Sequence, residues 1–203
     1  LHSFPTRRSS DLGNFSGFLG TGKTTALKSL MEQKDPNEKW VIIVNEFGEI
    51  GIDGAVLSDN GIPVAEIAGG CLCCTAGPQM GVTVQKMLRD AKPDRLMIEA
   101  SGLAHAASVI DELKAKPLDS LLEIGAVFTV VDPRQFINPD YAQQALYKDQ
   151  IGICDVLVAS KTDLCTPEQL AEFHDKAAKL FPPKAKVVEV QNAQNYQDRK
   201  SVV

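Results

Sequence analysis

The sequence predicts an α/β fold in which a mostly parallel central sheet carries helices on both faces. Apolar runs rich in β-branched residues alternate along the chain with segments of helical period. The polar and glycine-rich motifs follow directly after these apolar runs. Because ligands of such sheets bind at the carboxyl ends of the strands, this placement predicts one shared site at one edge of the sheet.

Strands are expected where β-branched apolar residues form short continuous runs, the pattern of a strand buried on both faces. Most of these runs end at a polar or glycine-rich position, where a strand gives way to a loop. We expect strands at residues 39–44, 64–67, 95–100, 124–131, 155–159 and 186–190.

Helices are expected where apolar residues recur three and four positions apart, as Val84, Met87 and Leu88 do. Proline marks several boundaries, because it fits the first turn of a helix but cannot continue one. The expected helices are residues 25–31, 81–91, 104–116, 141–151 and 168–181.

The two ends of the chain depart from this pattern. Residues 1–12 carry a proline, two arginines and an aspartate where a buried strand is expected. They resemble a translated sequencing adapter, and residues 198–203 invite the same interpretation. We therefore expect both ends to be non-native, with a first strand reduced to a stub near residues 13–16 and one domain over residues 13–197.

The composition, with 44% apolar and 23% charged residues, is that of an ordinary globular protein. A net charge of −5 argues against a nucleic acid or an acidic membrane held by bulk charge. The sequence shows neither an apolar run of about 18 residues nor a secretory signal. Cys154 and Cys165 look like single thiols of a reducing compartment, so a cytoplasmic protein is expected.

Residues 17–24 read Gly-Phe-Leu-Gly-Thr-Gly-Lys-Thr and fit the phosphate-loop pattern Gly-x4-Gly-Lys-Ser/Thr. Glycines let backbone N–H groups approach phosphate oxygens, and the helix that follows directs its N-terminus at the anion. Lys23 would reach the β- and γ-phosphates, and the Thr24 hydroxyl would hold Mg²⁺. The alternative is a glycine-rich turn that matches the pattern by chance.

Residues 160–163 read Ser-Lys-Thr-Asp at the end of an expected strand. An aspartate there can accept hydrogen bonds from N1–H and the 2-amino group of guanine, donors that adenine lacks. Asp163 would read the base in this way, while the aliphatic stem of Lys161 lies over it. Ser160 replaces the asparagine of the pattern Asn-Lys-x-Asp. These residues favour GTP, and a surface loop with a chance Lys-x-Asp is the alternative.

Residues 99–102 read Glu-Ala-Ser-Gly at the end of another strand. The carboxylate of Glu99 can hold Mg²⁺ through water, while the N–H of Gly102 approaches the γ-phosphate. The alternative is a strand that ends in an ordinary turn.

The segment 45–54 offers three carboxylates, those of Glu46, Glu49 and Asp53. In a nucleotide switch such a segment becomes ordered with GTP and relaxes after hydrolysis. Any of the three could position the attacking water, and a solvated acidic loop is the alternative for each.

Residues 71–74 read Cys-Leu-Cys-Cys. Three thiolates in four positions suit a soft or borderline ion such as Zn²⁺. A fourth ligand would come from Glu49, from water or from a recipient protein, and incomplete ligation suits a site that passes its metal on. Buried or redox-active thiols are the alternative.

Taken in this order, the motifs closely resemble those of the CobW family of GTPases, over roughly residues 16–192. The resemblance implies a P-loop nucleoside-triphosphatase fold of the SIMIBI G-domain type. It also implies a GTP-hydrolysing metallochaperone that binds zinc, or cobalt in some members, and delivers it to a client protein. The smaller C-terminal domain of the family is missing from this sequence.

The motifs and the resemblance together give candidate roles to named residues. Candidates for catalysis are Lys23, Glu46, Asp53 and Glu99. Candidates for nucleotide contacts are Gly20, Thr21, Gly22, Lys23, Thr24, Thr25, Gly102, Lys161, Asp163 and, as a weaker transfer, Asn192. Candidate metal ligands are Thr24 for Mg²⁺ and Cys71, Cys73, Cys74 and Glu49 for Zn²⁺.

Two other functions fit parts of the pattern. One is a P-loop kinase or ATPase with structural or redox cysteines, and the other is a non-enzymatic zinc-binding module. The expected partners are GTP or GDP and a metal-receiving client protein, without nucleic acid or membrane. A homo-oligomer is compatible with the sequence.

Overall fold

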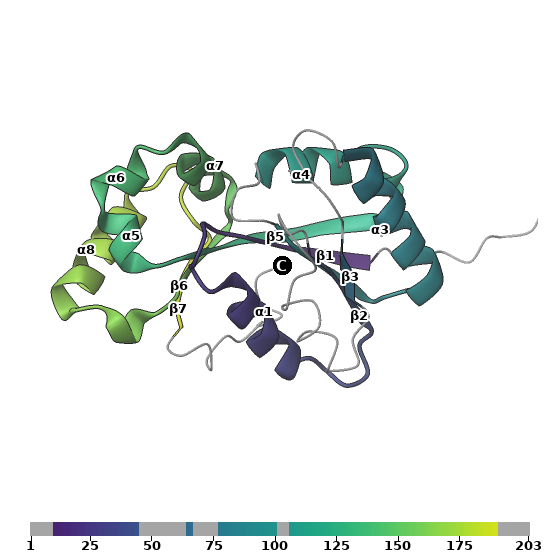
Figure 1. Cartoon of the computed structure of the whole chain (residues 1–203), viewed down its shortest axis with the longest axis horizontal. Coiled ribbons are helices and arrows are strands. Elements are labelled where there is room, and N and C mark those ends of the chain that lie inside the picture. The colour runs from purple at the N-terminus through teal and green to yellow at the C-terminus, as the bar shows by residue number, and fades with distance from the viewer. Residues whose placement is uncertain (1–9, 45–63, 67–76, 101–105, 191–203) are drawn as a thin grey trace, which may run out of the picture.

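The computed structural model describes residues 10–44, 64–66, 77–100 and 106–190 (Figure 1). The strands of this part are β1 (Ser10–Ser16), β2 (Trp40–Val44), β3 (Val64–Glu66), β4 (Arg95–Glu99), β5 (Leu122–Val131), β6 (Val156–Ala159) and β7 (Lys186–Glu189). The α-helices are α1 (Lys23–Glu32), α3 (Gly77–Ala91), α4 (Ala106–Leu113), α5 (Pro133–Ile137), α6 (Pro139–Ala142), α7 (Ala145–Ile153) and α8 (Pro167–Ala178). Short 3₁₀ helices are η1 (Leu118–Ser120) and η2 (Thr162–Leu164).

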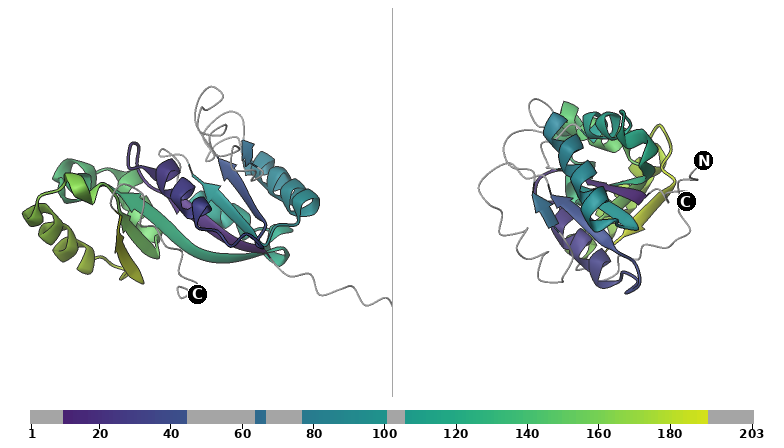
Figure 2. Two further views of the ribbon diagram at one scale, coloured as in Figure 1. Left: turned by 90° about the horizontal axis from the view of Figure 1, so that it is seen from below. Right: turned by 90° about the vertical axis from the view of Figure 1, so that its right-hand side faces the viewer.

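The described strands form one seven-stranded sheet in the order β3-β2-β4-β1-β5-β6-β7. The pairings between these strands are all parallel. Figure 2 shows the twist of the sheet, with α3 and α8 at opposite ends of the molecule. The predicted parallel α/β fold is confirmed. Strand β1 lies at the centre, at the point where the strand order reverses and where such sheets bind ligands.

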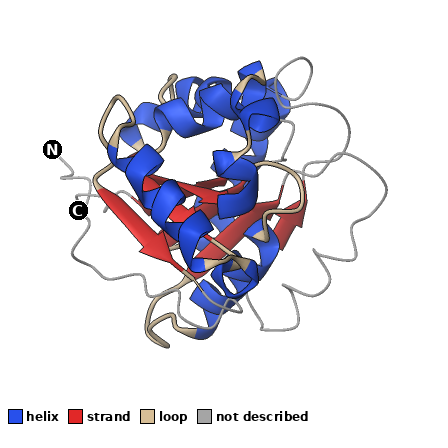
Figure 3. Ribbon diagram, turned by 90° about the vertical axis from the view of Figure 1, so that its left-hand side faces the viewer, coloured by secondary structure: helices blue, strands red, loops and turns tan. Residues whose placement is uncertain are grey.

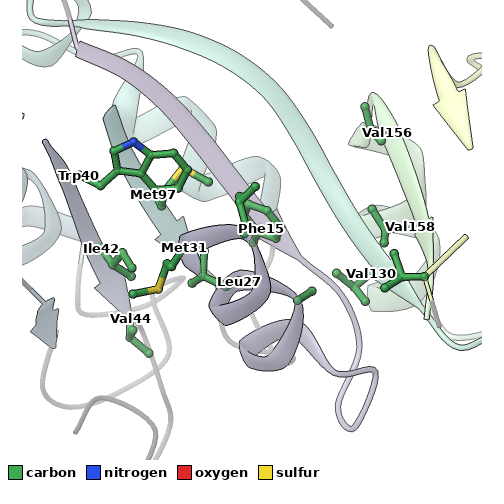
Figure 4. Packing of buried hydrophobic residues seen from close by; sticks show 13 residues of the cluster. Phe15, Leu27, Met31, Trp40, Ile42, Val44, Met97, Val130, Val156 and Val158 are labelled. Carbon is green, nitrogen blue, oxygen red and sulfur yellow. The ribbon is translucent and has the colours of Figure 1, made fainter. Parts of the chain in front are cut away.

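Helices cover both faces of the sheet, above and below the strands in Figure 3. On one face, Leu27 and Met31 of α1 pack against Phe15, Ile42 and Met97 of three neighbouring strands (Figure 4). The alternate strand residues face the other way and pack against α3, α4, α5, α7 and α8. The central strand is therefore buried on both faces, and the loop that follows it is anchored in the core.

Strand β1 begins three residues earlier than the predicted stub at residues 13–16. Asp11 pairs with Arg95 of β4, and Ser10 pairs with Leu122 of β5. The Ser10 hydroxyl also donates a hydrogen bond of 2.6 Å to the carbonyl of Pro93. The predicted length of this strand was wrong, because backbone pairing on both sides holds residues 10–12 in the sheet despite the polar side chains of Ser10 and Asp11.

Strand β1 buries an amide that has no hydrogen-bond partner among the described residues. The side chain of Asn14 is 2% exposed, and neither its Oδ1 nor its Nδ2 is satisfied. Replacing Asn14 with leucine, which has the same branched arrangement of heavy atoms, should stabilise the fold by about 1 to 3 kcal/mol. Urea unfolding should show a higher midpoint. Asn14→Asp, which buries a charge, should lower the midpoint, and a leucine variant that also lowers it would contradict the prediction.

The segment after β5 differs from the prediction of one helix over residues 141–151. The chain forms α5, α6 and α7 instead, and α5 was not predicted. Asn138 ends α5 and caps α6, because its side chain accepts a hydrogen bond from the Asp140 N–H. Gln144 then adopts an extended conformation directly before α7. The extended backbone of Gln144 therefore divides a segment whose apolar spacing reads as one helix.

Candidate functional site

The turn between β1 and α1 depends on backbone angles that favour glycine. The φ angles of Gly17, Gly20 and Gly22 are +144°, +72° and +86°. A Cβ atom on Gly17 would lie 2.3 Å from the carbonyl oxygen of Val130. Gly22 is the N-cap of α1, so the helix begins at Lys23 as the phosphate-loop pattern requires. These residues form the predicted phosphate loop, with the N-terminus of α1 at its end.

The carbonyl of Phe18 holds the first half of this loop together. It accepts hydrogen bonds from Thr21 Oγ1 at 2.8 Å and from Lys23 Nζ at 3.1 Å. The ring of Phe18 packs edge-on against Tyr141 and Tyr147 of the helical segment after β5. Lys23 is therefore anchored on the loop.

Thr24 and Glu99 meet at the start of α1. The Thr24 hydroxyl donates a hydrogen bond of 2.8 Å to Oε1 of Glu99, whose side chain is 5% exposed. Strand β4 brings the glutamate there, because the Ala100 N–H donates to the Phe15 carbonyl across the β1–β4 pair. A hydroxyl and a carboxylate are the oxygen ligands that Mg²⁺ prefers. The two residues that the sequence assigned to Mg²⁺ therefore fit that ion.

The 160–163 motif lies against the phosphate loop. The Ser160 hydroxyl lies 2.6 Å from the Thr21 carbonyl oxygen and 3.0 Å from that of Val131, so it bridges the loop and β5. Lys161 Nζ donates a hydrogen bond of 2.5 Å to the Gly20 carbonyl. Asp163 is exposed in η2. The shorter serine thus links its motif to the phosphate loop, in the position where the common pattern has asparagine.

Sequence reasoning missed an ion pair beside this motif. Asp132 follows β5 directly, and its side chain is 3% exposed. Arg134 Nε and Nη2 donate to its two oxygens at 3.0 and 2.6 Å. Burial alone raises the pKa of Asp132, but the Arg134 hydrogen bonds and the charges of Arg134 and Lys161 hold it below its ordinary value. The available signal was an aspartate at a strand end, the position that the other motifs share.

Several predicted site residues lie outside the described part of the chain. They are Glu46, Glu49, Asp53, Cys71, Cys73, Cys74, Gly102 and Asn192. Within the described ranges, no group of three or more His, Cys, Asp and Glu side chains could hold a metal ion. Thr25 is exposed on the first turn of α1. The zinc ligands and the water-positioning carboxylates therefore stay predictions.

The described cysteines are both free. Cys154 is buried and Cys165 is partly exposed. Burial raises the pKa of each thiol, so both are mostly protonated at neutral pH.

None of the described helices has the length and apolar character of a membrane span.

Comparison with protein families adds an independent observation. The family described as "CobW/HypB/UreG, nucleotide-binding domain" matches residues 12–189. The chain belongs to the CobW/HypB/UreG family. Residues 12–189 of this CobW/HypB/UreG domain include the phosphate loop, Glu99 and the 160–163 motif.

Curated relatives carry the same type of domain. The chain is 46% identical over 153 residues to the zinc chaperone YeiR of Escherichia coli, covering 75% of the chain and 47% of that protein. It is 30% identical over 207 residues to the zinc chaperone CobW of Sinorhizobium sp, covering 88% of the chain and 58% of that protein. The chain therefore spans about half the length of these relatives of the CobW/HypB/UreG family.

Solved structures share the fold. The hydrogenase maturation factor HypB from Archaeoglobus fulgidus has a TM-score of 0.64 at 17% identity, covering 90% of this chain and 81% of that one. The Zn(II)-bound YjiA GTPase from E. coli has a TM-score of 0.63 at 21% identity, covering 96% and 65%. These likenesses support the architecture expected of a CobW/HypB/UreG nucleotide-binding domain.

Proposed function

We propose that this chain is the GTP-binding and GTP-hydrolysing domain of a zinc metallochaperone. One observation carries the nucleotide part of the proposal. At the carboxyl edge of the sheet, the phosphate loop is hydrogen-bonded to Glu99 through Thr24 and to Lys161 through the Gly20 carbonyl. Asp163 follows Lys161 at the spacing that reads guanine.

Each described group has a distinct task in this proposal. The N–H groups at the start of α1 and the ammonium group of Lys23 bind phosphate oxygens. Thr24 and Glu99 hold Mg²⁺, which when bound neutralises charge on the β- and γ-phosphates. Lys161 and Asp163 fix the base. Glu46 and Asp53 are our candidates for positioning the attacking water.

The metal part of the proposal rests on the sequence and on the relatives. Cys71, Cys73 and Cys74, with Glu49 as a fourth candidate, supply the donors that Zn²⁺ prefers. The curated relatives YeiR and CobW are named zinc chaperones. We infer that the domain passes zinc to a client protein, in the reducing cytoplasm where such thiols stay free.

Two measurements on the chain test the proposal. GDP and GTP should bind at least about tenfold more tightly than ADP and ATP, because adenine lacks the donors that Asp163 accepts from. Zinc affinity should differ between a GTP analogue and GDP. Equal zinc affinities would rule out coupling between the nucleotide and the zinc site. A ligand that binds two states with equal affinity does not change the equilibrium between them. Equal use of ATP would favour a kinase or an ATPase instead.

Removal of the Thr24 hydroxyl should uncouple nucleotide binding from Mg²⁺. Thr24→Ala loses a ligand of the ion, so the gain in GTP affinity on adding Mg²⁺ should shrink by about tenfold. Fluorescence titration with and without EDTA measures this gain. Thr24→Ser keeps the hydroxyl and should retain most of it. An alanine variant with an unchanged Mg²⁺ dependence would remove Thr24 from the metal site.

A further inference from the structure

Asp132 and Lys161 start from the ends of two neighbouring strands. Strand β5 ends at Val131 and β6 ends at Ala159. The Ser160 N–H donates a hydrogen bond of 2.8 Å to the Val131 carbonyl, which ties the two ends together. Asp132 follows Val131 and Lys161 follows Ser160, so both residues lie at the same edge of the sheet.

The carboxylate of Asp132 lies between two cations. Arg134 contacts both of its oxygens, and Lys161 Nζ lies 3.9 Å from Oδ2. The aspartate is almost fully buried, whereas the side chains of the arginine and the lysine are each 38% exposed. A buried carboxylate is stable only when it is paired, so Asp132 attracts both cations to the end of β5, next to the phosphate loop.

Lys161 adopts a conformation that its surroundings must hold. Its φ angle is +54°, in the left-handed region that non-glycine residues rarely occupy. Its Nζ atom contacts the Gly20 carbonyl and lies near the Asp132 carboxylate. The ammonium group is thus placed by an acceptor on the phosphate loop and by the negative charge of Asp132.

We propose that Asp132 is a positioning residue that fixes Lys161 against the phosphate loop. By fixing the lysine, Asp132 raises the affinity for the purine base of the nucleotide. The inference rests on the proposed nucleotide-binding function. A stem whose end is fixed loses little further freedom when a base packs on it. Asp132 acts through Lys161 and does not read the edge of the base, so its effect is the same for each purine.

Loss of the neighbouring Arg134 distinguishes the positioning role of Asp132 from a purely structural role of the Asp132–Arg134 ion pair. If the Asp132–Arg134 pair only stabilised the fold, loss of either partner would weaken nucleotide binding. If Asp132 positions Lys161, loss of Arg134 removes a competing cation. Among the described residues, Lys161 is then the cation left beside the carboxylate, and Asp132 should hold it at least as firmly as before. The two interpretations predict opposite results for Arg134.

Four variants test the proposal: Asp132→Asn, Lys161→Met, the double variant and Arg134→Met. Asparagine keeps the cap that Asp132 gives to α5, because asparagine is an equally good N-cap. Fluorescence titration with GDP should show three- to tenfold weaker binding for Asp132→Asn, and no further loss when it is added to Lys161→Met. Arg134→Met should bind GDP as tightly as the wild type, or more tightly.

Three results would overturn the proposal. They are an unchanged affinity in Asp132→Asn, losses that multiply in the double variant, and a loss in Arg134→Met equal to that in Asp132→Asn. If the wild type prefers ADP, guanine recognition is overturned but the role of Asp132 is not. The same four variants, titrated with ADP in place of GDP, then test that role. A wild type that binds neither nucleotide would overturn both.

Discussion

Gly17→Ala should unfold the phosphate loop, destabilise the chain by roughly 3 kcal/mol and weaken GDP binding by roughly 100-fold. The added Cβ would lie 2.3 Å from the Val130 carbonyl and 3.1 Å from Thr21 Oγ1. The φ angle of +144° is also unfavourable for alanine. Neither group can move easily, because Val130 belongs to a central strand and Thr21 is fully buried.

Gly152→Ala is the matched control for that variant. A Cβ on Gly152 meets no atom within 4 Å, and the residue lies inside α7. Alanine should therefore stabilise the helix by about 0.5 to 1 kcal/mol and leave GDP binding unchanged. Urea unfolding and GDP titration of both variants measure the contrast. Normal binding by Gly17→Ala would show that the loop tolerates a side chain where the structure places none.

Phe15→Ala should destabilise the chain by about 3 to 5 kcal/mol, the range for removing a fully buried aromatic ring. Phe15 is fully buried on β1, and its ring stacks on Phe128 with 5.1 Å between centroids. A large share of the stability of an ordinary domain would be lost, since that total is about 5 to 15 kcal/mol. The midpoint of urea unfolding measures the effect.

Phe181→Ala makes the same chemical change at a position that is 91% exposed. It should shift the free energy of unfolding by less than about 0.5 kcal/mol. Similar losses for the two phenylalanines would mean that the core around β1 does not carry the stability assigned to it.

The fold could be predicted because central strands such as β2 are buried on both faces. The runs 39–44 and 124–131 are continuous and β-branched, and they appear as β2 and β5 with ends shifted by at most two residues. Strand β1 could not be delimited in this way, because its first two residues, Ser10 and Asp11, are polar. Pairing with two neighbours decides its length, and pairing is a property of the sheet as a whole.

The site was predictable where one short motif carries its own geometry. The glycines, Lys23 and Thr24 sit in consecutive positions, so their arrangement follows from the turn and the helix. The pairing of Thr24 with Glu99 follows from both lying at strand or helix ends on one edge. The ion pair of Asp132 and Arg134 was missed, since an aspartate at a strand end also fits an ordinary helix cap.

The hydrogen bonds on the carbonyls of Phe18 and Gly20 have a consequence for ligand affinity. Side chains of the chain itself maintain the turn, so its conformational entropy is lost during folding and little remains to be lost on association. The ammonium group of Lys23 can exchange the neutral Phe18 carbonyl for an anionic oxygen, and charge-assisted hydrogen bonds are roughly twice as strong. The loop is preorganised, and a polyphosphate gains affinity by replacing a weaker contact with a stronger one at little entropic cost.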